Sequence, residues 1–403
     1  MKIIYYLLFI VPIIALGQSS LQNDQKIAIG TVKTFHSNVL NEDRELLVYV
    51  PNSGGVDSNT RYPVMYLLDG YSFFHSATGM MQYLSAIGKM PEMIVVAIVN
   101  TDRVRDLTPT HSTIGFDGQE VPFLKNSGGG EQFLSFIEKE LFPYIDSTYK
   151  TEPYRMFVGH SLGGLTVVNT FLNHPALFNA YVAIDPSLWW DNQLLIKQAA
   201  TIVAQKDYIG KSLFFAAANA KEKGSVAEVK ESANDNLPGV DKLQFHELLK
   251  NAKNTTLAWD WKFYSEDNHS SVPLMAQYDA MRSLFKKFEL DKELSDTTIT
   301  TAYIKNHYQN LSAALQYPLL PAQSTVNLLG YAFLAHKNYD KAYSFFKMNM
   351  ENYPTSSNVY DSMGDFYVAQ EDRKKAMEYF EKALSLKEVT ETRKKLERLK
   401  LEN

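Results

Sequence analysis

The segment Gly159-His160-Ser161-Leu162-Gly163 constrains the fold of this chain more strongly than any other. It has the pattern G-x-S-x-G and lies between a strand-like run, YRMFV, and a helix-like run, LTVVNTFLNH. Glycines two residues before and two residues after a serine let the strand and the helix pass closely, and the strained turn holds the serine oxygen out of the fold. We therefore predict a strand-turn-helix unit in which Ser161 is a nucleophile.

Composition limits the class of protein. The 403 residues are enough for two or three domains, and 45% hydrophobic residues fit a globular chain. A formal net charge of -5 offers no basic surface, so we expect no nucleic-acid partner. The chain contains no cysteine, which excludes disulfides and a cysteine-linked lipid anchor.

The N-terminus has the features of a secretory signal. Lys2 precedes an apolar run over residues 3–16, and Ala15-Leu16-Gly17 has the small-x-small spacing of a signal peptidase site. The run is shorter than the roughly 20 apolar residues that span a bilayer. We expect residues 1–17 to be cleaved, which gives a periplasmic or secreted protein without stable membrane insertion.

Residues 25–290 alternate strand-like with helix-like sequence. This order favours a mostly parallel, doubly wound α/β sheet. The α/β-hydrolase arrangement is the member of that class that has a nucleophile elbow. The predicted strands, besides the one before Ser161, are 44–50, 62–70, 93–100, 180–185, 211–219 and 257–264.

The C-terminal part contains an internal repeat. A polar segment, 291–301, reads as a linker, and no strand-like run follows it. Five positions of the segment 302–403 return in kind 34 residues later, a period and residue set that resemble the tetratricopeptide repeat. The pairs are Leu329 and Met363, Gly330 and Gly364, Phe333 and Tyr367, Ala342 and Ala376, and Phe346 and Phe380. We expect a small all-α domain that could bind a protein partner.

A serine nucleophile needs a base, and in this fold the chain order is serine, then acid, then histidine. Of the nine histidines, His269 lies in the loop SEDNHSSVP, after the last predicted strand and before the last helix of the hydrolase part. This position predicts that His269 is the general base. A neutral imidazole can accept the serine proton near pH 7 and pass it to the leaving group.

The acid that orients the histidine is less constrained by position. We favour Asp235, in the non-helical NDNLPG ahead of a helix, with Glu222 as the second choice because it follows a strand end closely. The other candidates are Glu228, Glu231, Asp241, Asp185 at the end of the preceding strand, and Asp267 beside the base.

The oxyanion of acyl transfer needs two preorganised donors. One is the backbone N–H of Leu162, directly after the nucleophile. For the other we predict the N–H of Tyr71 in LLDGYSFF, where Gly70 lets the backbone turn. A simple Asp-Gly turn is the alternative reading of that segment.

Five motifs in order resemble the esterase family that includes enterochelin and bacillibactin esterases. They are LLDGYSFF, NTDRVRDLTPTHS, GHSLGGL, DPSLWWD and EDNHSSVP, and the resemblance covers roughly residues 27–290. It implies the same roles for Ser161, His269, Leu162 and Tyr71. It also implies that the arginines and tryptophans of these motifs lie near the substrate, although ion pairing or core packing would explain them equally well. These residues are Arg103, Arg105, Trp189 and Trp190.

Two features depart from that family. Asp185 stands before Pro186-Ser187 where siderophore esterases tend to have serine, and the repeat segment is an addition. The resemblance therefore leaves the substrate open among small-molecule and glycan esters. We expect a serine esterase that needs no metal or organic cofactor; an acyltransferase or thioesterase on the same site, or a non-catalytic binding protein that uses the repeats, are the alternatives.

Overall fold

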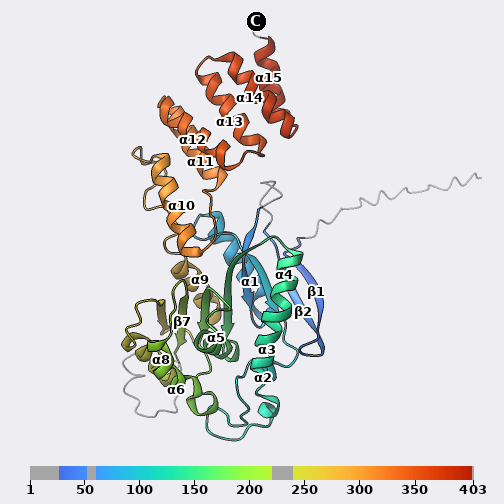
Figure 1. Cartoon of the computed structure of the whole chain (residues 1–403), viewed down its shortest axis with the longest axis vertical. Coiled ribbons are helices and arrows are strands. Elements are labelled where there is room, and N and C mark those ends of the chain that lie inside the picture. The colour runs from blue at the N-terminus through green and yellow to red at the C-terminus, as the bar shows by residue number, and fades with distance from the viewer. Residues whose placement is uncertain (1–26, 52–59, 220–238, 402–403) are drawn as a thin grey trace, which may run out of the picture.

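The computed structural model describes residues 27–51, 60–219 and 239–401. The expected signal, residues 1–17, lies outside the described residues. Eight strands form one sheet in the order β1-β2-β4-β3-β5-β6-β7-β8 (Figure 1). The strands are β1 (Thr31–Ser37), β2 (Glu42–Tyr49), β3 (Tyr62–Leu67), β4 (Ile94–Ile98), β5 (Thr151–His160), β6 (Ala180–Ile184), β7 (Ser212–Ala218) and β8 (Ala258–Tyr264).

The six strands from β3 to β8 pair in parallel, whereas β2 pairs antiparallel with both β1 and β4. The parallel strands therefore all end at the same edge of the sheet, where ligands bind in folds of this class. The sequence did not predict β1. It is an edge strand in which only Ser37 is buried, so it lacks the run of buried apolar residues that marks strands such as β3, β4 and β6.

Helices cover both faces of the sheet, as the predicted doubly wound architecture requires. Alternate residues of a strand point to opposite faces, and in β5 Phe157 joins one core cluster while Met156 and Val158 join the other. The cluster of Met156 includes residues from α1 (Gly70–Ala86) and α9 (Val272–Leu284). The cluster of Phe157 includes residues from α3 (Gly130–Phe136), α4 (Phe142–Thr148), α5 (Leu162–Asn173), α6 (Trp190–Gln205) and α8 (Val240–Asn251).

The helix predicted around EQFLSFIEKELFPYI is not regular. Between α3 and α4 a π-helical turn, η2, covers Ile137–Leu141. Pro143 follows in the first turn of α4 and has no N–H to donate to the preceding turn, which favours such a local irregularity. Two shorter elements, α2 (Arg103–Asp106) and η1 (Pro122–Asn126), lie in the long loop between β4 and α3.

The C-terminal part is helical, as predicted. Within it, Gly364 lies so close to Phe380 that an added Cβ would come 2.4 Å from the ring, and Gly330 meets Phe346 in the same way at 2.6 Å. The repeated glycines thus leave the space that the repeated aromatic rings occupy. The helices are α10 (Thr301–Leu315), α11 (Gln323–Ala335), α12 (Tyr339–Asn352), α13 (Ser357–Ala369), α14 (Arg373–Leu386) and α15 (Thr390–Leu401).

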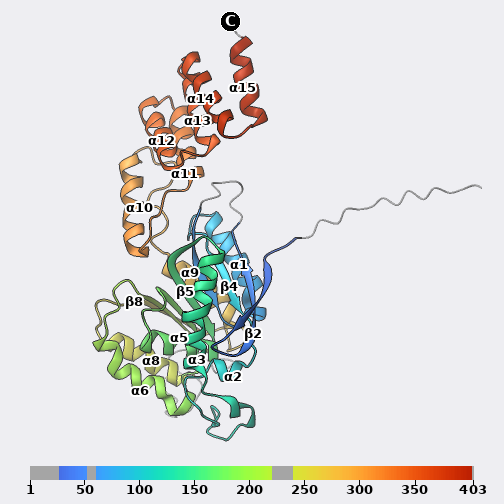
Figure 2. The same cartoon turned by 45° about the vertical axis from the view of Figure 1, so that its right-hand side comes forward.

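Helices α11 to α15 lie at the end of the molecule opposite α2, α6 and α8 in both views (Figures 1 and 2). The predicted linker falls in the segment 285–300, which has neither helix nor strand. The division into domains 25–290 and 302–403 stays a prediction. Leu315 and Tyr317 lie in the second of these ranges but pack in a core cluster of the sheet, which belongs to the first. Among the described helices, none is long and apolar enough to cross a bilayer.

Candidate active site

Ser161 lies in the sharp turn between β5 and α5, as predicted. Its backbone angles, φ 60° and ψ -118°, are outside the regions that residues with a side chain ordinarily adopt. A Cβ on Gly159 would come 2.3 Å from the carbonyl oxygen of Gly163, so only glycine fits there. The turn is also tied to the next strand, since the N–H of Ser161 donates to the carbonyl of Ile184 at 3.1 Å.

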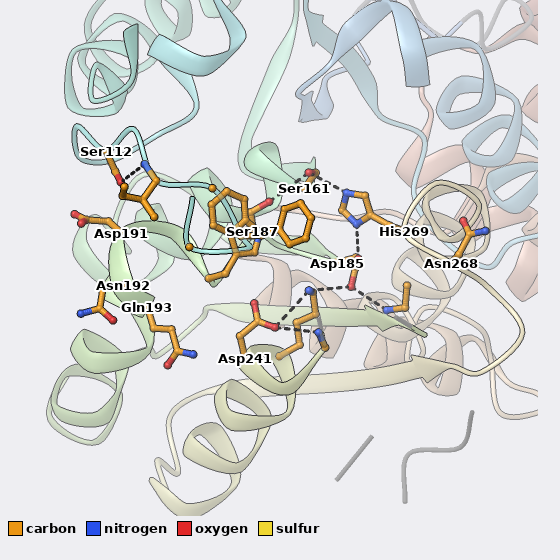
Figure 3. A pocket seen from close by; sticks show the side chains of 18 of the residues that line it. Ser112, Ser161, Asp185, Ser187, Asp191, Asn192, Gln193, Asp241, Asn268 and His269 are labelled. Atoms are coloured by element: carbon orange, nitrogen blue, oxygen red, sulfur yellow. Dashed lines mark hydrogen bonds and ion pairs between the residues drawn. The ribbon is translucent and has the colours of Figure 1, made fainter. Parts of the chain in front are cut away.

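His269 faces the serine, also as predicted. Its Nε2 lies 3.0 Å from Ser161 Oγ, which is within hydrogen-bond reach for proton transfer (Figure 3). The loop that carries it is braced by Asn268, whose side-chain oxygen accepts from the N–H groups of Ser270 and Ser271.

The carboxylate on His269 is that of Asp185. His269 Nδ1 donates to Asp185 Oδ2 at 2.5 Å (Figure 3). This geometry corrects the preference for Asp235 and then Glu222, both of which lie outside the described residues. The physical reason is the sheet order: β6 is the parallel neighbour of β5, so a residue directly after β6 lies beside one directly after β5. Asp185 was among the further candidates.

Asp185 is 4% exposed, and its surroundings favour the ionised form. Burial alone would raise the pKa of this carboxyl, but the charge of Lys242 and the hydrogen bonds from His269 and Ala218 hold the pKa below its usual range. Lys242 Nζ lies 3.7 Å from Asp185 Oδ1, and the N–H of Ala218 donates to the same oxygen at 3.0 Å. Asp185 therefore stays an acceptor for the imidazole N–H.

Lys242, on α8, is itself buried between two carboxylates. Its ammonium lies 3.5 Å from Asp241 Oδ1 in addition to its contact with Asp185. Burial alone would lower the pKa of Lys242, but the two carboxylates raise it above its usual value. Sequence reasoning missed this contact, because Lys242 has the pattern of an ordinary charged position at the start of a helix.

The backbone N–H groups predicted to bind an oxyanion lie at two neighbouring helix starts. Leu162 is the first residue of α5, and Tyr71 follows Gly70 at the start of α1. The first N–H groups of a helix have no partner within the helix. Since β3 and β5 are parallel neighbours, these two helix starts lie at the same edge of the sheet. The exposed Tyr71 ring turns elsewhere, with its hydroxyl donating to Glu45.

The two predicted substrate-binding arginines are engaged in ion pairs. Arg103 holds the Asp69 carboxylate through Nε at 2.6 Å and Nη2 at 3.0 Å, and Nη2 also reaches the carbonyl of His160 at 3.3 Å. Arg103 thus links the turn before α1 to the elbow. Arg105 pairs with Glu42 at 2.6 Å and with Asp106 at 2.7 Å. Neither arginine is among the described residues that line the cavity at Ser161.

The two tryptophans predicted to bind substrate have different surroundings. Trp190 is 1% exposed, and its Nε1 donates to Thr110 Oγ1 at 3.3 Å, so it is a core residue. Trp189 lines a cavity of about 820 Å³ that opens over the catalytic group. Other residues lining this cavity are Ser161, Asp185, Ser187, Asp241 and His269 (Figure 3).

Two further residues touch the catalytic group. Ser187 Oγ lies 3.3 Å from Ser161 Oγ, and its N–H donates to the carbonyl of Ser161 at 3.1 Å. His160 donates from Nε2 to the carbonyl of His269 at 2.8 Å, and the two rings lie 4.5 Å apart. Burial, and then the neighbouring His269, lower the pKa of His160 to about 4, so it is neutral at neutral pH. The described residues contain no group of three or more His, Asp or Glu side chains placed to bind a metal ion.

A family model described as "Putative esterase" matches residues 37–271, which is more than half of the chain. The chain belongs to this esterase family. A tetratricopeptide repeat model matches residues 357–390, which confirms the repeat resemblance.

Curated relatives match the hydrolase part. The chain is 30% identical over 182 residues to the ferri-bacillibactin esterase BesA of Bacillus subtilis, covering 41% of this chain and 61% of that protein. It is 29% identical over 171 residues to the siderophore enterobactin esterase of Emericella nidulans, covering 38% of this chain and 54% of that protein. Both alignments leave more than a third of the relative's length unmatched.

Solved structures extend the likeness in fold. An IroE-like serine hydrolase from Shewanella oneidensis is 29% identical, with a TM-score of 0.66, over 80% of this chain and 99% of that one. An uncharacterised protein from Capnocytophaga ochracea superposes over 92% of this chain and 99% of its own with a TM-score of 0.59. At 16% identity this second likeness concerns the fold alone.

Proposed function

We propose that this protein hydrolyses carboxylic esters through an acyl-enzyme on Ser161. The observation that carries the proposal is the chain of contacts from Ser161 Oγ to His269 Nε2 at 3.0 Å and from His269 Nδ1 to Asp185 Oδ2 at 2.5 Å. A nucleophile, a base and a group that orients the base in this arrangement are what acyl transfer requires.

The reaction has two halves. Ser161 Oγ attacks the ester carbonyl while His269 Nε2 takes its proton, and the N–H groups of Leu162 and Tyr71 stabilise the oxyanion. The imidazolium then protonates the leaving alcohol. In the second half His269 takes a proton from water, the resulting hydroxide attacks the acyl carbonyl, and Ser161 recovers its proton as the acid leaves. Asp185 keeps the imidazole oriented and stabilises its charged form throughout.

Labelling by a fluorophosphonate and turnover of p-nitrophenyl butyrate test the proposal. We expect both from the wild-type chain, no labelling of Ser161→Ala, and loss of nearly all turnover in His269→Ala. If the folded wild-type protein is neither labelled nor active, the esterase proposal is wrong and the alternative, a non-catalytic binding protein, is favoured. Product analysis in the presence of added alcohols separates hydrolysis from acyl transfer, because a transferase forms the new ester.

Three wider proposals accompany this activity. Names of the relatives make siderophore esters one substrate class to screen, beside acylated glycans and other small esters. We also propose that the protein is exported, on the basis of its first 17 residues, which N-terminal sequencing of the protein from fractionated cells would test. The repeat helices contribute no described residue to the cavity, so we propose for them a role in docking a protein partner.

A further inference from the structure

The described lining of the cavity over Ser161 has an excess of negative charge. Its charged lining residues, among those described, are the carboxylates of Asp185, Asp191 and Asp241 and the ammonium of Lys242. Lys242, Asp185 and Asp241 are all buried, and the ammonium contacts both of these carboxylates, whereas Asp191 is partly exposed. Three negative groups against one positive group give the lining a net charge of -2 while His269 is neutral.

One carboxylate oxygen of Asp241 accepts no hydrogen bond from the described residues. Its Oδ1 receives Lys242 Nζ and the N–H of Gly239, at 3.5 and 3.3 Å. Its Oδ2 is buried and has no hydrogen-bond partner among the described residues. Figure 3 draws Asp241 and Asp185 among the side chains that line the cavity. A desolvated carboxylate oxygen without a donor is costly, so a ligand that supplies a hydroxyl or ammonium donor would be stabilised there.

An anionic ligand would need an accessible cationic side chain, and the described lining of the cavity has none. The two arginines expected to serve this role are engaged with Asp69 and with Glu42 and Asp106. A cavity walled by one sign of charge focuses its potential on whatever enters. An anionic ester would therefore meet repulsion that a neutral or cationic ester does not.

Apolar side chains complete the cavity. Phe116 and Trp189 lie edge to face, with ring centroids 6.3 Å apart. Phe116 is 59% exposed and Ile114 is 46% exposed, although both line the cavity. Exposed apolar groups at a cavity mouth are suited to cover an aromatic or aliphatic part of a ligand.

We infer that the cavity takes neutral or cationic esters that combine an aromatic or apolar group with hydrogen-bond donors, and that it discriminates against anionic esters. This inference rests on the proposed esterase function for its substrate but not for its binding site. Phenolic acyl esters of sugars and iron-free catechol esters both have the required chemistry. A ferric tris-catecholate, a multiply charged anion, does not.

The first test compares kcat/KM for two esters of equal chain length, p-nitrophenyl butyrate and mono-p-nitrophenyl succinate, at low salt. We expect the succinate, whose chain ends in a carboxylate, to be poorer by roughly tenfold or more, with the gap narrowing as salt is added. Asp191→Asn should narrow the gap as well, whereas Glu138→Gln, which removes an exposed charge away from the cavity, should not. Equal use of the two esters would overturn the inference.

The second test does not depend on turnover. Titration calorimetry on Ser161→Ala compares methyl ferulate with ferulate, which differ in charge, and we expect ferulate to bind roughly tenfold or more weakly. Ferulate binding as tightly, or no binding of methyl ferulate, would contradict the inference. A binding preference in a protein whose wild type turns over neither p-nitrophenyl ester would contradict the proposed function alone.

Discussion

The ammonium of Lys242 lies 3.7 Å from Asp185 Oδ1, the carboxylate oxygen that His269 does not use. Asp185 thus joins a buried cation to the imidazole of His269. Because burial opposes a charged carboxylate, the nearby positive charge is what lets Asp185 stay ionised in this position. Lys242 is therefore a positioning residue, which acts through Asp185.

Replacing Lys242 with methionine should raise the pKa of Asp185, since burial would no longer be opposed by the ammonium. Asp185 is needed as a carboxylate, so activity is present above its pKa and is lost as the pH falls through it. We expect the acidic limb of kcat/KM against pH to move to higher pH. Breaking a buried ion pair also costs about 3–5 kcal/mol of stability.

The matched control is Lys250→Met, which removes an exposed ammonium from the same helix and keeps Lys242 beside Asp185. Its acidic limb should stay close to that of the wild type. An unshifted acidic limb in a folded Lys242→Met protein would show that Lys242 acts only on stability.

Asp185→Asn should lower kcat by about 10³- to 10⁴-fold, because an amide cannot hold the imidazole in the tautomer that accepts the serine proton. Asp235→Asn is the comparison, and we expect it to retain most of the activity. Steady-state kinetics on p-nitrophenyl butyrate measure both. Should Asp235→Asn prove the more damaging of the two, the acid assignment would pass to the segment 220–238.

His160 should make folding sensitive to mild acid. Its pKa in the folded chain, about 4, is below the ordinary value of 6.5, so the unfolded chain binds the proton first as the pH falls. Stability is therefore lost between about pH 6.5 and 4, with a slope of up to about 1.4 kcal/mol per pH unit from this group. Urea unfolding as a function of pH measures it. His160→Gln should flatten the slope, while His174→Gln, a change at the surface, should leave it unaltered.

Gly364→Ala should destabilise the repeat helices by about 1–3 kcal/mol, because the new methyl would lie 2.4 Å from the Phe380 ring. Thermal unfolding would detect this loss. Kinetics on small esters should be unchanged, since the described lining of the cavity lies within residues 112–270. Adding Phe380→Leu should recover part of the stability, and a double variant no better than the single one would argue against this packing explanation.

Chain order was enough to find Ser161 and His269. The elbow pattern predicts the nucleophile, and only one histidine lies in a loop between the last predicted strand and the last predicted helix of the hydrolase part. Asp185 was harder to choose, because several loops carry acids and a sequence does not say which loop ends beside the elbow. The deciding fact is the pairing of β5 with β6, which is a property of the sheet.

The arginines illustrate a second limit. Their motif suggested contact with a substrate, yet Arg103 and Arg105 have carboxylate partners at 2.6 Å that come from Asp69 and Glu42. Those partners lie far away in sequence, so their pairing becomes visible only in the fold. The same holds for Lys242, whose neighbour Asp185 is in a different element.

Tyr317 lies beyond the predicted border of the hydrolase part, yet its side chain packs in a core cluster of the sheet. It follows α10, is 5% exposed, and its ring centroid lies 6.3 Å from that of Tyr154 on β5, the strand that ends at the elbow. A protease cut within 291–301 would separate this ring from the sheet against which it packs. A truncated protein that contains only the hydrolase part would have to extend beyond Tyr317, because this side chain covers β5, the strand that leads to Ser161.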